Sequence, residues 1–144
     1  MLVQNIVGSK LNTKIYTITK SHTIDDAVSD LAAHRVGALV VSDDGKIIDG
    51  ILSERDIIRE MGKRGTACLS EKVGDMMTGV VSCCSMKDSA QSVLEAMTEG
   101  RFRHMPILEN GKLAGVISIG DVVKARLEEM ANEHSAMVDM IRGV

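Results

Sequence analysis

The chain contains an internal repeat, and this repeat constrains the fold more than any other feature of the sequence. Residues 3–56 and 73–121 carry the same motifs in the same order. Gly-Ile-Leu-Ser-Glu-Arg-Asp at 50–56 returns as Gly-Val-Ile-Ser-Ile-Gly-Asp at 115–121. Such a duplication predicts two related halves that pack together. It also predicts a cleft between the halves in which a small ligand binds.

Each half has the pattern of an opening apolar segment followed by a β-α-β-β-α unit. In the first half we expect the opening segment at 3–7, a strand at 14–18, a helix capped by Thr23, strands at 38–41 and 47–52, and a helix from Ser53 to about Gly62. In the second half we expect the opening segment at 73–77, a strand at 79–83, a helix capped by Asp88, strands at 105–108 and 113–117, and a helix from Ser118 that continues to Gly143. Asp44-Gly45 and Asn110-Gly111 predict a hairpin within each strand pair.

A half of about 50 residues is too small to bury its own sheet and helix faces. The expected fold class is therefore α/β (α+β), with two β-α-β-β-α repeats packed by pseudo-twofold symmetry into one module. The expected boundaries are 1–62 for the first repeat, 63–72 for a connector, 73–125 for the second repeat and 126–144 for a C-terminal helical extension.

The composition argues against several classes of function. A net charge of −3 and only two aromatic residues do not suit nucleic acid or anionic lipid as partners. Without an apolar run of transmembrane length or a secretory signal pattern, we expect no membrane association and a cytoplasmic location. The three cysteines are expected to be reduced. Metal-ligand spacing, a P-loop and a dinucleotide fingerprint are not found, so we expect neither a metal site nor an enzyme.

A Ser-x-x-Asp motif follows the last strand of each half, as Ser53 to Asp56 and as Ser118 to Asp121. In one interpretation the motif caps a helix and places an acidic residue in its first turn. In the other, the aspartate binds a ribose diol while the helix N-terminus faces a phosphate. The spacing does not decide between them, because a duplication copies a helix cap as well.

Basic residues gather in Arg-Phe-Arg-His-Met-Pro at 101–106. This segment is either a solvated start of a strand or a phosphate-binding edge, since arginine suits phosphate oxygens. Pro106 within a strand indicates an edge position. Arg55 lies in a first helical turn, where the helix dipole disfavours a cation, so it indicates either a nearby anion or an ordinary surface arginine.

Together, Gly-Ile-Leu-Ser-Glu-Arg-Asp, Arg-His-Met-Pro-Ile and Gly-Val-Ile-Ser-Ile-Gly-Asp in tandem resemble a pair of cystathionine β-synthase (CBS) domains, or Bateman module, from about Val3 to Lys124. The resemblance implies a stand-alone regulatory module that binds an adenosine derivative. AMP is favoured, and ATP, ADP, NAD(H) and S-adenosylmethionine are alternatives. The implied roles are ribose binding by Asp56 and Asp121, phosphate or ribose binding by Ser53, Arg55, Arg103, His104 and Ser118, and an adenine pocket at Thr17, Asp75, Val80, Met105 and Pro106.

The two halves differ, because Arg55, His104 and Pro106 each lack a counterpart in the other half. We therefore expect one good site, or two sites of different affinity. The resemblance also implies a homodimer and an effector protein. The apolar residues of the C-terminal helix either pack on its own domain or form a dimer contact. Two other functions are kept as alternatives, which are a ligand-free structural scaffold and a thiol redox sensor using Cys83 and Cys84.

Overall fold

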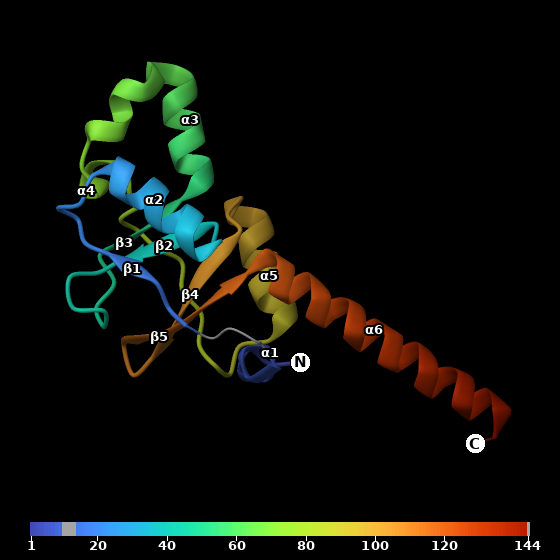
Figure 1. Ribbon diagram of the computed structural model, residues 1–144. Helices are drawn as coiled ribbons and strands as arrows, with labels where there is room; N and C mark the ends of the chain where they lie inside the picture. Colours follow the sequence, from blue (N-terminus) through green and yellow to red (C-terminus); the bar gives the residue numbers. More distant parts are fainter. Residues whose placement is uncertain (10–13, 144) are drawn as a thin grey trace.

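The computed structural model describes residues 1–9 and 14–143 (Figure 1). The first repeat contains α1 (Val3–Ser9), β1 (Thr17–Ile18), α2 (Ile24–His34), β2 (Ala38–Val41), β3 (Gly50–Ser53) and α3 (Glu54–Arg64), and the 3-10 helix η1 (Gly65–Ser70) leads to the second repeat. The second repeat contains α4 (Val73–Met76), α5 (Ala90–Gly100), β4 (His104–Glu109), β5 (Lys112–Ser118) and α6 (Ile119–Arg142). This mixed arrangement of two repeats confirms the predicted fold class.

Each repeat has its own small sheet. In the first, β1 pairs in parallel with β2, and β2 pairs antiparallel with β3. In the second, β4 and β5 form an antiparallel pair, and the turn at Asn110 and Gly111 has the positive φ values, 55° and 77°, expected of a tight Asn-Gly hairpin. The hairpin predicted there is confirmed.

The strand predicted at 79–83 is wrong, and the proline of β4 explains why. Only an isolated parallel bridge joins Cys84 to Ile107. The Cys84 N–H donates to the Pro106 carbonyl at 3.0 Å, and the Leu108 N–H donates to the Cys84 carbonyl at 2.8 Å. Pro106 stands where β2 has Val40, and it has no N–H to extend this ladder toward residue 82.

The tight hairpin predicted at Asp44-Gly45 is also wrong, because β3 begins at Gly50 and a longer loop spans 42–49. Asp44 Oδ1 accepts hydrogen bonds from the backbone N–H groups of Lys46 at 2.8 Å and Ile47 at 2.9 Å. These bonds hold the pKa of Asp44 below its usual value. The aspartate side chain thus binds the backbone donors that a two-residue hairpin would give to the opposite strand.

Side-chain caps fix where the helices begin. Thr23 caps α2 and Ser118 caps α6, as predicted, and both form reciprocal capping boxes. The cap predicted at Asp88 is wrong by one residue. Ser89 caps α5 by accepting a hydrogen bond from the Ser92 N–H at 3.0 Å, while Asp88 accepts one from the Ser85 N–H at 2.8 Å.

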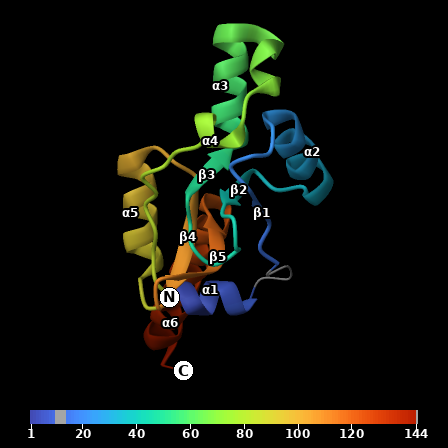
Figure 2. The same ribbon diagram turned by 90° about the vertical axis from the view of Figure 1, so that its left-hand side faces the viewer.

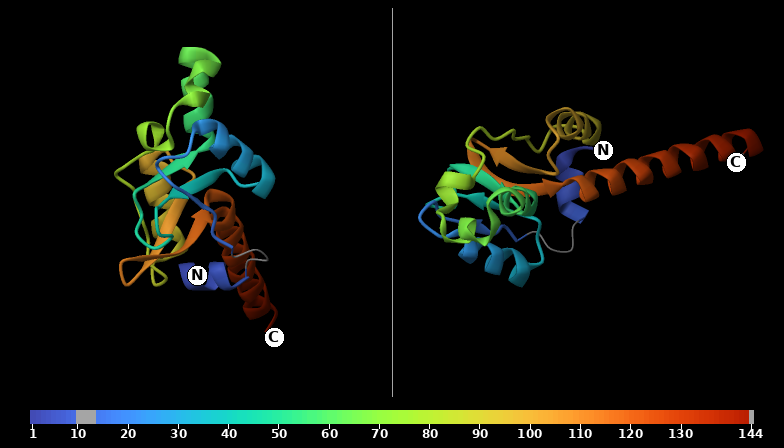
Figure 3. Two further views of the ribbon diagram at one scale, coloured as in Figure 1. Left: turned by 60° about the vertical axis from the view of Figure 1, so that its left-hand side comes forward. Right: turned by 90° about the horizontal axis from the view of Figure 1, so that it is seen from above.

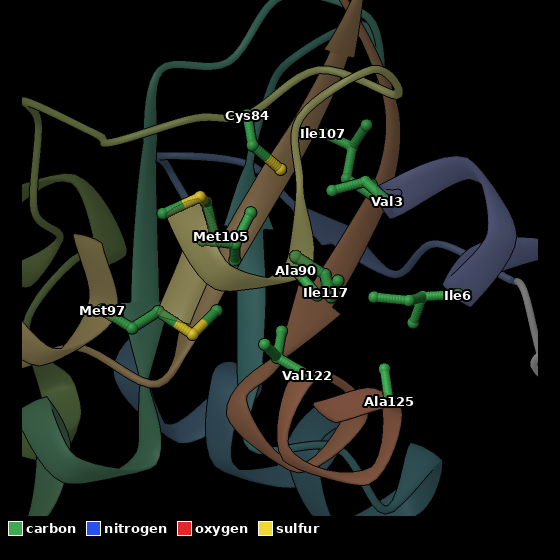
Figure 4. Close-up of a cluster of buried hydrophobic side chains, with 11 residues drawn as sticks. Val3, Ile6, Cys84, Ala90, Met97, Met105, Ile107, Ile117, Val122 and Ala125 are labelled. Carbon is green, nitrogen blue, oxygen red and sulfur yellow. The ribbon is translucent and has the colours of Figure 1, made fainter. Parts of the chain in front are cut away.

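The opening helices of the two repeats are exchanged. α1 belongs to the first repeat in sequence, but Val3 and Ile6 are buried in the core of the second repeat, where α1 contacts β5 and α6 (Figures 2 and 4). α4 belongs to the second repeat, but Val73 is buried in the core of the first. Each repeat therefore completes its core with a segment of the other.

Backbone hydrogen bonds hold the two exchanged segments in the same way. The Val3 N–H donates to the Asp88 carbonyl at 2.8 Å, and the Gln4 N–H donates to the Met86 carbonyl at 3.0 Å. In the other repeat, the Val73 N–H donates to the His22 carbonyl at 2.8 Å, and the Gly74 N–H donates to the Lys20 carbonyl at 3.1 Å. This matched set has the pseudo-twofold relation expected of a duplication.

Gly50 provides a test of how closely the segment after α4 packs on the first repeat. A Cβ at Gly50 would lie 2.7 Å from the Thr78 carbonyl oxygen and 2.6 Å from Met77 Sδ, whereas at the equivalent Gly115 it would lie 3.3 Å from Ile107 Cδ1. We expect Gly50→Ala to lower the free energy of unfolding by about 1–3 kcal/mol. Gly115→Ala should lower it by less in the same urea titration, and equal losses would contradict this packing.

Candidate functional site

A hollow of about 280 Å³ lies where the two repeats meet. Its volume is near the lower end of the range for small-molecule pockets, roughly 300–1,000 Å³. The first repeat supplies the segment before β1 and the segment that joins α2 to β2, and the second supplies the start of β4, the end of β5 and the start of α6. The lining residues are Lys14, Ile15, Tyr16, Arg35, Val36, Gly37, Ala38, His104, Val116, Ser118 and Asp121.

Asp121 is held on the wall of the hollow by the start of α6. Its Oδ2 accepts a hydrogen bond from the Ser118 N–H at 2.9 Å, and its own N–H donates to Ser118 Oγ at 3.1 Å. This is the capping interpretation of Ser-x-x-Asp, and the structure bears it out. This capping role does not exclude a ligand, because the capping box holds the Asp121 carboxylate beside the hollow. The N-terminus of α6 also lies there, and a helix N-terminus favours a bound anion.

Asp56 forms the same capping box in the first repeat but has different surroundings. Its Oδ2 accepts from the Ser53 N–H at 3.0 Å, and its Oδ1 accepts from Arg59 Nη2 at 2.6 Å. Neither Ser53 nor Asp56 lines the hollow. The two aspartates are therefore equivalent as helix caps but not as candidate ligand groups.

Among the described residues, three basic side chains line the hollow, and of these only His104 was identified from the sequence. His104 lies opposite Ser118 in the β4–β5 register. Arg35 ends α2 in the left-handed conformation, with a φ of 54°. Lys14 Nζ lies 5.7 Å from the centroid of the Tyr16 ring, which itself stacks on His34 with 3.8 Å between ring centroids.

A glycine makes room for His104. A Cβ added at Gly37 would lie 2.9 Å from His104 Cε1 and 3.1 Å from its Nε2. The equivalent residue of the second repeat is Arg103. The close approach of the imidazole to the start of β2 thus requires the small residue that the first repeat has here.

The other predicted site residues lie outside the hollow. Arg55, on α3, and Arg103, just before β4, are exposed. Thr17, Asp75 and Val80 are exposed as well. Met105 and Pro106 are buried, and Met105 is part of the core of the second repeat at 2% exposure. The adenine-pocket roles of Met105 and Pro106 stay predictions, and in this structure neither side chain lines the hollow.

Sequence reasoning missed Lys14, Tyr16, Arg35 and Gly37. The signal for Arg35 was present, because the repeat aligns Arg-Val-Gly-Ala at 35–38 with Arg-Phe-Arg-His at 101–104. Arg101 likewise ends its helix in the left-handed conformation, with a φ of 56°. The repeat thus places an arginine at the left-handed end of both helices, and of the two only Arg35 lines the hollow.

Comparison with known proteins identifies the family of this chain. The family model described as "CBS domain" matches residues 5–63 and 73–128. The chain belongs to the CBS-domain family. A protein from Agrobacterium tumefaciens, the CBS-domain containing protein ATU1752, has a solved structure with a TM-score of 0.83 and 42% identity, covering 88% of this chain and 99% of that one.

Two further proteins are also similar to this chain. CBSX3 of Arabidopsis thaliana, described as mitochondrial, is 35% identical over 129 residues, which cover 87% of this chain and 63% of that relative. The structure titled "CBSX2 in complex with AMP" has a TM-score of 0.71 and 25% identity, covering 90% of this chain and 98% of that one. The predicted CBS pair is confirmed.

Metal-ligand clusters and membrane-spanning helices are both absent from the part of the chain that the structure describes. Within residues 1–9 and 14–143, no three His, Cys, Asp or Glu side chains come together as metal ligands. None of the described helices is both long enough and apolar enough to cross a membrane. The cytoplasmic location stays a prediction.

The environment of the two adjacent cysteines weighs against a redox sensor. Cys84 is buried, and burial, with smaller effects from Asp88 and Cys83, raises the pKa of its thiol to about 12. Burial also raises the pKa of the Cys83 thiol, although its side chain reaches solvent. A raised pKa lowers the thiolate fraction on which oxidation depends.

We expect a thiol reagent at pH 8 to modify Cys83 more slowly than a free cysteine, and Cys84 only on unfolding. Because the pKa of the Cys83 thiol is raised, the rate of its modification should still be increasing above pH 9. Mass spectrometry after timed alkylation measures both rates. Rapid reaction of both thiols at pH 7 in the folded protein would restore the redox alternative.

Proposed function

We propose that this CBS pair is a non-catalytic regulatory module that binds an adenine nucleotide in the hollow between its repeats. The observation that carries the proposal is the position of Asp121 on one wall, with Lys14, Arg35 and His104 on the same hollow. A carboxylate can accept from both hydroxyls of a ribose, and cations suit phosphate oxygens. The AMP complex of CBSX2 supports the ligand class.

The proposed roles follow from the chemistry of the lining residues. Asp121 and Ser118 bind the ribose, and Arg35, Lys14 and His104 bind the phosphate. The apolar side chains of Ile15, Val36, Ala38 and Val116 remain for the base. Asp56, Ser53, Arg55 and Arg103 would serve a second, weaker site on the other side of the pseudo-twofold axis.

AMP is favoured over ADP, ATP and NAD(H) because the hollow is small. A volume of about 280 Å³ leaves little room beyond one adenylate. Longer phosphates or a second nucleoside would have to extend out of the hollow into solvent.

We further propose that the module is a homodimer and passes its signal to an effector protein. A nucleotide in the hollow touches both repeats, so it favours those relative orientations of the repeats in which it makes all its contacts. The output is then a change in the population of conformations that a partner protein distinguishes.

Replacing Asp121 tests the ribose contact, and Asp56 provides a matched control. Asp121→Ala should weaken AMP by about tenfold or more, since a lost hydrogen bond to a charged group is worth about 1.5–3 kcal/mol. Asp56→Ala removes the same kind of capping box but should change AMP affinity far less. Isothermal titration calorimetry measures both, and equal losses would contradict the assignment.

No binding of AMP, ATP, NAD or S-adenosylmethionine by the unmodified protein would favour the ligand-free scaffold.

Replacing Arg35 tests the phosphate contact. Arg35→Ala should weaken AMP by about tenfold while leaving adenosine affinity nearly unchanged, because only AMP carries the phosphate. Arg101→Ala is the control, since Arg101 ends α5 in the same left-handed conformation but lies outside the hollow. Equal weakening of adenosine and AMP by Arg35→Ala would show that the phosphate lies elsewhere.

A further inference from the structure

The last helix extends well beyond the domain from which it starts. α6 spans 24 residues. Val122 and Ala125, near its start, are buried in the core of the second repeat. After this point the helix leaves the body of the molecule, and its C-terminal half lies away from every other described element (Figures 1 and 3). A helix this far from its own core needs another contact to bury its apolar side chains.

An exposed stripe runs along α6 with the spacing of a coiled coil. Its members follow one another at intervals of 4, 3, 4, 3 and 4 residues, which is the heptad pattern of a and d positions. The stripe residues are Val123, Leu127, Met130, His134, Met137 and Ile141. The five apolar members are 42%, 61%, 56%, 62% and 80% exposed in that order.

The stripe lies on a different side of α6 from the one that packs on its own domain. Val122 and Ala125 face the core, and at 100° per residue the stripe is centred about 130° away from them. Most of the stripe therefore faces away from its own domain. The face of α6 opposite the stripe, here called the outer face, is polar. Its residues are Glu128, Asn132, Ser135 and Asp139, as expected of an amphipathic helix.

We propose that the stripe pairs with the same stripe of a second copy of this chain, in a parallel two-stranded coiled coil. This inference rests on the proposed homodimer and names its contact surface. The flanking residues bring no like charges together in the parallel arrangement, in which Arg126 lies near Ala131 of the second copy and Glu133 lies near Val138. An antiparallel pair that overlaps along the whole stripe instead brings the two copies of Glu133 together, which is unfavourable.

His134 is the one polar member of the stripe, and it occupies an a position in the middle. A polar residue at a single a position lowers the stability of a coiled coil but specifies its register and the number of strands. The two copies of His134 meet only in the parallel, in-register pair. The histidine thus selects this pairing over registers that would place it against Leu127 or Ile141.

The test is the dimer dissociation constant measured by analytical ultracentrifugation. Met137→Lys should weaken the dimer by at least about tenfold, and Asn132→Lys, which adds the same charge to the outer face, should not. His134→Leu should tighten the dimer by about tenfold. Because residue 137 lies beyond the domain body, Met137→Lys should leave both the fold and AMP affinity unchanged, so loss of the dimer is separable from loss of the ligand site.

Disulfide formation tests the orientation. In a Cys83→Ala background, Met137→Cys should form an intermolecular disulfide under mild oxidation, because a parallel pair places the two copies of this d position side by side. A monomeric unmodified protein at high micromolar concentration, a dimer insensitive to Met137→Lys, or an absent disulfide would each overturn the proposal.

Discussion

The exchange of α1 and α4 between the repeats is the interaction on which the rest of this structure depends. Val3 completes the second repeat and Val73 the first, and both are fully buried. Two backbone hydrogen bonds at the start of each exchanged helix cross between the repeats with matching lengths. Neither repeat can form its complete core alone, so the two fold as one unit.

This joining of the two repeats forms the hollow between them, and the chemistry of the hollow is asymmetric. The end of α2 and the start of β2 lie against the starts of β4 and α6, so Arg35 and Asp121 share one cavity. Gly37 admits His104, whereas its counterpart Arg103 has a long side chain. Pro106 ends the parallel pairing that Val40 allows in the first repeat. Small departures from exact duplication therefore give the two sides of the pseudo-twofold axis different ligand groups.

Much of the fold could be predicted from the sequence, because local signals specify it. The repeat, the caps at Thr23, Ser53 and Ser118, and the Asn110-Gly111 turn each reflect chemistry within a few residues. The exchange could not be predicted, since an apolar segment does not record which core it enters. The site was predicted in part. Ser118, Asp121 and His104 belong to recognisable motifs. Lys14 and Tyr16 lie in a segment whose pattern predicts a strand but no ligand contact, and they reach the hollow only through tertiary packing.

Native-state hydrogen exchange of the amides that cross between the repeats tests this account most directly. The Val3 and Val73 N–H groups donate to the Asp88 and His22 carbonyls of the opposite repeats. If the exchanged helices are part of one cooperative core, both amides should exchange only on global unfolding, with the same free energy as the amides of β2 and β5. Exchange of either amide at a clearly lower free energy, while the central strands stay protected, would show that the opening helices are detachable and would contradict the account.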